Sequence, residues 1–209
     1  KANIKTSRWR LETIMDKPVL LLRRFDRQAG QRIPFLSAMN MLGAKDNDSH
    51  SYLEIAYAIT QHGASPNSDL EELWRRIIFT VLISNTDDHL RNHGFLYDRH
   101  KGWRLSPAYD VNPTPVEVKG RILSTSIDYD DPTASIGLAL SVIDEFRIKK
   151  ARAIAIIKEV ALAVSEWRAV ATKFGLTKRE IDRMASAFEH EDFQKLKSDS
   201  HYNQIQIKK

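Results

Sequence analysis

The stretch from Asp69 to Ile83 constrains the fold of this chain most, because it is long, amphipathic and followed directly by a dense polar run. Ser68 or Asn67 can cap its first turn, and acidic residues near its start favour the positive end of a helix. Its apolar side chains recur at helical spacing and form one stripe that requires burial; they are Leu73, Ile77, Ile78 and Val81. The sequence therefore predicts a core helix over 69–83.

The other patterns predict a mainly helical α+β domain with a small β-hairpin insert. Residues 18–22 form a short apolar run typical of a buried strand, with which residues 7–15 could pair. Residues 94–97 and 103–105 predict a hairpin with a polar turn. The remaining predicted elements are a helix over 51–61, a strand over 121–127 and two long helices over 151–174 and 178–196, separated by Gly175 and with Thr177 as a cap.

The composition is that of an ordinary soluble domain with one substantial core, at 209 residues, 42% hydrophobic and 28% charged. The absence of cysteine excludes disulfides and thiolate metal sites and is compatible with a cytoplasmic location. The longest apolar stretch, Ile154 to Val164, is too short to cross a membrane, and no signal peptide opens the chain. Because the sequence begins with Lys1, it can be a portion of a longer product.

Three polar residues surround the predicted hairpin: Asp87 and Asn92 before it, and Asp110 after it. Phosphoryl transfer needs a carboxylate that orients the attacking hydroxyl and accepts its proton, and oxygen ligands that hold Mg²⁺ against the phosphates. Protein kinases use an aspartate, an asparagine five positions later and a second aspartate beyond a hairpin. The bland alternative is that these residues only cap the helix and form turns. The hairpin followed by Tyr109 and Asp110 favours a phosphate and metal site.

The stretch Asn85-Thr86-Asp87-Asp88-His89-Leu90-Arg91-Asn92-His93-Gly94-Phe95-Leu96, followed by Trp103-Arg104-Leu105-Ser106-Pro107-Ala108-Tyr109-Asp110, resembles the catalytic core of HipA-like serine/threonine protein kinases. Arg23-Arg24-Phe25-Asp26-Arg27 resembles the hinge between the lobes of that family. The resemblance is detailed from about Pro18 to Pro113. It implies the C-terminal lobe of a kinase fold over 28–197, preceded by the last N-lobe strands and the hinge over 1–27 and followed by a polar tail over 198–209.

The same resemblance implies roles for individual residues. Asp87 would be the catalytic aspartate, and Asn92 and Asp110 would hold Mg²⁺. The backbone of a hinge segment would bind the adenine of ATP, and four further residues would line the nucleotide pocket; these residues are Arg23, Arg24 and Phe25 in the hinge, and His89, Leu90, Arg91 and Tyr109 in the pocket. The family often has lysine at the position of Arg91. For His89, a hydrogen bond that locks the loop is an equal alternative, and Asp88 and His93 are expected to support the site or face solvent.

The phosphate-covering loop and the phosphate-binding lysine of a kinase are not recognisable here. The residues before Arg23 contain no glycine, and Lys1, Lys5 and Lys17 are expected at the surface. The resemblance places both parts in an N-terminal lobe. We therefore expect this chain alone to bind ATP poorly.

The resemblance further implies a toxin of a bacterial toxin–antitoxin system that phosphorylates itself and an aminoacyl-tRNA synthetase, arrests growth and promotes persistence. A HipB-like helix-turn-helix antitoxin would be the partner, with operator DNA bound through that complex. The alternative is a binding or corepressor module that is inactive alone and docks through a basic cluster at Arg147, Lys149, Lys150 and Arg152. A small-molecule kinase is disfavoured because Thr86, rather than histidine, precedes Asp87.

Overall fold

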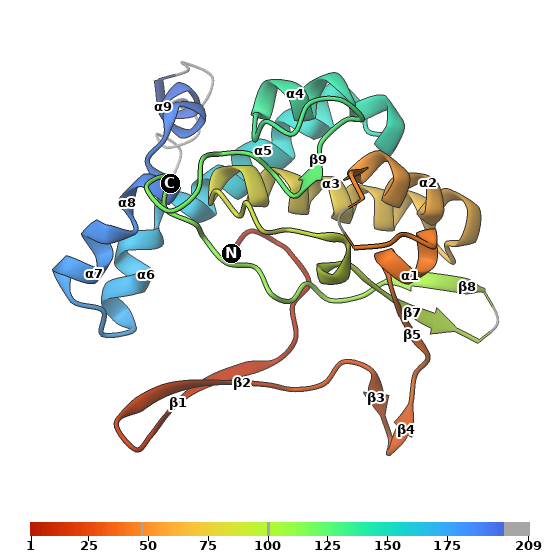
Figure 1. Ribbon diagram of the computed structural model, residues 1–209, viewed down its shortest axis with the longest axis horizontal. Helices are drawn as coiled ribbons and strands as arrows, with labels where there is room; N and C mark the ends of the chain where they lie inside the picture. Colours follow the sequence, from red (N-terminus) through yellow and green to blue (C-terminus); the bar gives the residue numbers. More distant parts are fainter. Residues whose placement is uncertain (47, 100, 199–209) are drawn as a thin grey trace.

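A computed structural model describes residues 1–46, 48–99 and 101–198. A layer of helices forms its centre, and the N-terminal strands extend away from this layer (Figure 1). The long helices are α2 (Tyr52–His62), α3 (Pro66–Leu82) and α5 (Lys150–Ser165), and α3 packs against both α2 and α5. Shorter helices complete the layer: α1 (Ala38–Leu42), α4 (Ile136–Ser141), and the 3₁₀ helices η1 (Leu90–Asn92) and η2 (Ile143–Phe146).

Helix α3 confirms the predicted core helix, although it begins three residues earlier than Asp69. Its N-cap is Ser65 rather than Ser68 or Asn67, because Pro66 occupies the first helical position, where proline loses no hydrogen bond. All four residues of the predicted apolar stripe are fully buried. The helix therefore forms the axis of the core around which the other elements pack.

The described residues form four small sheets. The predicted hairpin is confirmed as β7 (Gly94–Asp98) and β8 (Gly102–Leu105), and β5 (Phe35–Ser37) adds a third antiparallel strand beside β7. The strand predicted over 121–127 is wrong in extent. Only β9 (Thr125–Ser126) is extended, and it pairs in parallel with β6 (His50–Ser51). Just before β9, Ile122 forms a single antiparallel bridge with Thr133, and the Ser124 side chain donates to the Thr86 carbonyl, so the pairing does not extend into one long strand.

The N-terminal strands β1 (Trp9–Ile14) and β2 (Lys17–Leu22) pair as predicted, but the expectation that residues 18–22 are buried is wrong. Leu20 is 58% exposed and Leu22 is 52% exposed, because the two-stranded ribbon stands apart from the helical layer (Figure 1). A second small ribbon, β3 (Arg27–Gln28) and β4 (Gln31–Arg32), follows it.

The two long helices predicted near the C-terminus are each interrupted. The first ends at Ser165 and resumes as α6 (Trp167–Lys173) after Glu166. The second is divided into α7 (Lys178–Arg183), α8 (Ala185–Phe188) and α9 (Glu191–Ser198). The predicted N-cap is confirmed, since Thr177 and Glu180 form a capping box. The breaks let Phe188 stack on Trp167 at 4.4 Å between ring centroids.

Two predictions concern the chain as a whole. No helix within the described ranges has the length and apolar character that crossing a membrane requires. The predicted polar tail lies, from residue 199 onward, outside the described residues.

Candidate active site

The loop that carries Asp87 begins where α3 ends, and its path is fixed by the last carbonyl groups of that helix. The Ser84 amide donates to the Val81 carbonyl at 3.3 Å, and the Asn85 amide donates to the Thr80 carbonyl at 3.0 Å. Ser84 adopts the left-handed conformation, with φ of 51°, which reverses the chain at the helix end. Side chains from the C-terminal half supply further donors to this end, namely Arg121 to the Val81 carbonyl and His190 to the Leu82 carbonyl.

Asp87 and Asn92 lie together, as their spacing predicts. The side-chain amide of Asn92 donates to the Asp87 carbonyl at 3.3 Å, and the His89 amide donates to the same oxygen at 3.0 Å. Asp87 is exposed, whereas Asn92 is buried. Because Asn92 uses its Nδ2 in this bond, its Oδ1 remains an acceptor that is fixed in place and available to a ligand.

Asp88 turns inward from the same loop and anchors it in the core. Its carboxylate accepts from the hydroxyls of Tyr52 and Thr80 and lies 3.1 Å from Nε2 of His93. Burial alone would raise the pKa of Asp88, but His93 and the two hydroxyls outweigh it and hold the pKa below its usual value. These four side chains are buried, so Asp88 and His93 support the site from beneath and do not face solvent.

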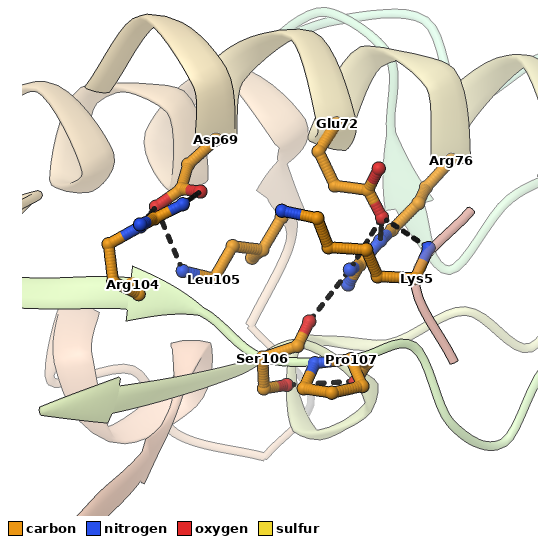
Figure 2. A network of polar contacts seen from close by, with 8 residues as sticks. All are labelled: Lys5, Asp69, Glu72, Arg76, Arg104, Leu105, Ser106 and Pro107. Atoms are coloured by element: carbon orange, nitrogen blue, oxygen red, sulfur yellow. Dashed lines mark hydrogen bonds and ion pairs between the residues drawn. The ribbon is translucent and has the colours of Figure 1, made fainter. Parts of the chain in front are cut away.

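The hairpin returns the chain to the loop because β8 is tied to α3 by two buried acidic residues (Figure 2). Asp69 binds Arg104 through two hydrogen bonds of 2.9 and 3.0 Å and also accepts from the Leu105 amide. Glu72 binds Arg76, whose guanidinium donates to the carbonyl of Ser106 at 2.7 Å (Figure 2). These contacts fix the segment that leads to Asp110.

Tyr109 connects that segment to the Asp87 loop, since its hydroxyl donates to the Arg91 carbonyl at 2.7 Å. Burial raises the pKa of the Tyr109 hydroxyl to about 12, so it remains a donor at neutral pH. Asp110, the next residue, is exposed and left-handed with φ of 54°, and its Oδ1 accepts from Asn112 at 2.9 Å. The neighbours of Asp110 and Asn92 are therefore hydrogen-bonded to each other, which joins the two segments that carry the predicted metal ligands.

Oxygen donors of this kind suit Mg²⁺, which proteins usually bind through one or two carboxylates together with substrate phosphates. Asp110 offers a solvent-facing carboxylate, and Asn92 offers the amide oxygen that its own hydrogen bond orients. In the described part of the chain, no group of three or more His, Cys, Asp or Glu side chains is arranged to bind a metal. The residues thus fit a cation shared with a phosphate, rather than one enclosed by the protein.

The predicted hinge borders a cavity of about 370 Å³ that also reaches Arg91 and Tyr109. Phe25 lies 5.7 Å from Tyr109 and 6.0 Å from Phe35, measured between ring centroids. Arg23 and Arg24 line the same cavity. The Arg24 guanidinium forms two hydrogen bonds to Asp26 and holds the pKa of that carboxyl well below its usual range. The Arg24 side chain is therefore already paired within the hinge. The cavity has the apolar walls that a planar base requires.

Three of the predicted pocket residues differ from one another in burial and in their partners. Leu90 is buried in the hydrophobic core, so only its backbone is available to a ligand. Arg91 is exposed, but its guanidinium is paired with Asp46, which the sequence did not single out. His89 is half-buried, and its buried Nδ1 has no hydrogen-bond partner among the described residues.

Sequence reasoning missed several residues of this site, namely Phe35, Asp46, Tyr52, Asn112 and Lys119. Lys119 donates from Nζ to the Thr86 carbonyl at 2.8 Å, across a separation of 33 residues. It lies in a segment with little regular structure, where no periodicity indicates a contact. In the basic cluster proposed for docking, Arg152 already forms ion pairs with Glu71 and Glu159.

The family described as the HipA-like C-terminal domain matches residues 1–190. A putative kinase of Haemophilus influenzae is 35% identical over 108 residues, which are 46% of this chain and 32% of that protein. Putative kinase Y4dM of Sinorhizobium fredii is 29% identical over 104 residues, which are 48% of this chain and 25% of that protein. This chain therefore matches about a third or less of the length of these curated relatives.

Two solved structures share the fold. One belongs to the Shewanella oneidensis toxin–antitoxin complex of HipA, HipB and operator DNA, with a TM-score of 0.73, 16% identity, and coverage of 90% of this chain and 50% of that chain. The other is the Helicobacter pylori proinflammatory kinase CtkA, with a TM-score of 0.59, 13% identity, and coverage of 90% and 76%. These likenesses assign a kinase-like fold of mixed helices and sheets.

Proposed function

Because this chain belongs to the HipA-like C-terminal domain family, we propose that it is the catalytic lobe of a Mg²⁺- and ATP-dependent serine/threonine protein kinase. Residues 28–197 form this lobe in the proposal, and residues 1–27 are the last strands of an N-terminal lobe with the hinge. The phosphate-covering loop and its lysine are supplied by another part of the protein. The relatives named as putative kinases support the general activity.

The observation that carries the proposal is the pair of bonds that fold the loop on the Asp87 carbonyl. Asp87 is exposed, and the Asn92 amide is held at the Asp87 backbone carbonyl. Asp87 then orients the acceptor hydroxyl and takes its proton, as the catalytic aspartate of a kinase does. Asn92 and Asp110 would hold Mg²⁺, which supplies charge neutralisation at the phosphates when bound.

The nucleotide base would occupy the cavity beside Phe25. Hinge residues line the cavity and would supply backbone groups for the base, apart from the Arg23 amide, which donates to the Arg8 carbonyl, and the rings of Phe25 and Tyr109 provide apolar contact. Arg91 lines the same cavity, but it must exchange Asp46 for a phosphate to bind one. The isolated chain is expected to bind Mg-ATP poorly, since the phosphate-covering parts are not recognisable in it.

The partners are proposed by analogy with the fold relatives. A neighbouring structure is a complex of HipA, HipB and operator DNA, which supports a helix-turn-helix antitoxin as the partner of this protein. We propose self-phosphorylation, and an aminoacyl-tRNA synthetase as the acceptor, with growth arrest in the cytoplasm as the result. Operator DNA would be contacted through the antitoxin, because Arg152 of the basic cluster is already in ion pairs.

The test is Asp87→Asn in the full-length protein, followed by transfer of labelled phosphate from ATP to the protein itself and to added protein acceptors. We expect a loss of at least about 10³-fold in transfer, since the proton acceptor is removed. Asp16→Asn, at the exposed turn between β1 and β2, is the matched control and should keep full activity. Unchanged transfer in the Asp87 variant, with the melting temperature preserved, would refute the proposal.

A further inference from the structure

The segment between Asp110 and β9 returns to the loop that carries Asp87. The Thr114 amide donates to the Ser84 carbonyl at 3.1 Å, and two side-chain donors of the segment meet at one atom of that loop, the carbonyl oxygen of Thr86. Lys119 donates to this oxygen at 2.8 Å, and the hydroxyl of Ser124 donates to it at 2.9 Å. The two donors also lie 3.4 Å apart. The segment is therefore joined to the loop one peptide bond before Asp87.

This contact brings a positive charge close to the predicted catalytic carboxylate. A trans peptide places the Thr86 carbonyl oxygen within about 3 Å of the Asp87 α-carbon, so the Lys119 ammonium lies within about 6 Å of that atom. The Lys119 side chain is solvent-exposed. An ammonium has three donors, and the two that are used here leave one directed elsewhere.

Within the described part of the chain, the Lys119 ammonium forms no direct ion pair. Its two hydrogen-bond acceptors are neutral oxygens, the Thr86 carbonyl and the Ser124 hydroxyl. The neighbouring cations differ in this respect, because Arg91 is paired with Asp46 and Arg76 with Glu72. A lysine held at a neutral carbonyl attracts an anion that enters beside it, and the Asp87 carboxylate is the other charge of this loop that such an anion meets.

We propose that Lys119 is a catalytic residue that binds the transferring phosphoryl group during the reaction of Asp87. This inference rests on the proposed function. In the step, the acceptor hydroxyl oxygen forms a bond to the γ-phosphorus of ATP while the bond from that phosphorus to the bridging oxygen of ADP breaks. The hydroxyl proton goes to Asp87, and ADP leaves with the electron pair. The charge spread over the three equatorial oxygens faces the Lys119 ammonium.

The competing explanation is that Lys119 only clamps the segment to the loop. Ser124 separates the two explanations, because it holds the same carbonyl without carrying a charge. A clamp loses comparable strength when either donor is removed. A phosphate ligand is lost only with the lysine, and arginine at that position restores part of its effect through its charge.

The experiment uses the full-length protein with Lys119→Met, Lys119→Arg and Ser124→Ala, and Asp87→Asn as a reference. We expect Lys119→Met to lower kcat by about 10² to 10³-fold, as removal of one preorganised donor does. Lys119→Arg should recover at least about tenfold of this loss, and Ser124→Ala should remain within about threefold of the parent. Melting temperatures of all variants should agree with that of the parent.

A binding measurement supports the kinetics without requiring turnover. In calorimetric titrations, Mg-ADP with aluminium fluoride imitates the transferring phosphoryl group, and Mg-ADP alone does not. Lys119→Met should weaken the first affinity by at least about 30-fold and change the second by less than about threefold, because a transition-state contact is lost selectively.

The Lys119 and Asp87 variants together distinguish failure of the role of Lys119 from failure of the proposed function. If Asp87→Asn abolishes transfer while Lys119→Met retains the parental kcat, the role of Lys119 is refuted and the proposed function stands. Equal losses in Lys119→Met and Ser124→Ala, with lower melting temperatures, identify a clamp and also refute it. If Asp87→Asn transfers phosphate at the parental rate, the proposed function fails, and the role of Lys119 fails with it.

Discussion

The loop that carries Asp87 and the strands that lead to Phe25 border the same site, but they are held in different ways. The loop is fixed from beneath by Asp88, whose three partners are buried. The strands β1 and β2 form a ribbon of two strands with exposed apolar side chains (Figure 1). Two strands alone are marginal in water, so the ribbon depends on further contacts for its stability.

The difference shows that the Asp87 side of the site is held rigidly by buried contacts, whereas the Phe25 side is reached through an exposed ribbon. Buried charge, hydrogen bonding and helix-end contacts fix the side that would perform the chemistry. The side that would bind the base is joined to it through the aromatic contact of Phe25 with Tyr109 and Phe35. Substitutions on the two sides should therefore differ strongly in their cost.

The largest effect is expected for Asp88→Ala. It removes the central acceptor and leaves His93 and the hydroxyls of Tyr52 and Thr80 buried without their partner. We expect a loss of about 3–5 kcal/mol in the free energy of unfolding, measured by urea denaturation. Asp46→Ala, which removes only an exposed ion pair with Arg91, should cost less than about 1 kcal/mol. Equal costs would show that the loop is not anchored through Asp88.

Gly94→Ala tests the packing between the two sides. A Cβ atom at this position would clash with the ring of Phe35 and lie 2.9 Å from Oγ of Ser106, so the Phe35 ring must leave its present position, where it contacts Phe25 and Tyr109. We expect a loss of about 1–3 kcal/mol in stability and weaker nucleotide binding in the full-length protein. Gly137→Ala, in α4 with space around it, is the control and should be neutral or stabilising. An unaffected Gly94 variant would show that the ring does not require this close approach.

A smaller effect is expected from pH, through His190 at the end of α3. Burial lowers the pKa of His190 to about 4, while an unfolded histidine has a pKa near 6.5. Since the unfolded chain binds the proton more tightly, this contribution is fully present above about pH 6.5 and is lost as the pH falls toward 4. We expect it to amount to about 1–2 kcal/mol, because His190 is only partly buried.

Denaturation at pH 7 and pH 4.5 measures this contribution. In His190→Gln the stability difference between the two pH values should shrink by that amount. His62→Gln, at an exposed position, should leave the difference unchanged. If both variants behave as the parent does, His190 does not titrate as its burial requires.

The smallest effect is expected on the ribbon. Leu20 is 58% exposed, so Leu20→Ser removes little buried area and should cost less than about 0.5 kcal/mol in the chain described here. The same substitution in the full-length protein measures whether another segment covers the ribbon. A loss above about 2 kcal/mol in the free energy of unfolding there would show that this segment buries Leu20. The ribbon would then be closer in stability to the Asp87 loop.

Much of the fold followed from local patterns in the sequence. The stripe of α3, the hairpin of β7 and β8, and the capping box at Thr177 each depend on residues close together in the chain, and each is confirmed. The strand expected over 121–127 was wrong in extent, because Ile122 bridges Thr133 while Thr125 and Ser126 pair with a different segment, β6. The breaks near Glu166 and Met184 follow from packing between Trp167 and Phe188, which no helical pattern contains.

The sequence by itself determined which residues of the site could carry chemistry, and that Asp87 and Asn92 lie close together, because five positions of one loop span a short distance. Only the tertiary structure decided that Asp88 turns inward while Asp87 faces out, that Arg91 is paired with Asp46, and that Lys119 reaches the loop from 33 residues away. Local geometry is set by neighbouring residues, whereas the direction and charge environment of a side chain depend on whatever the fold places against it.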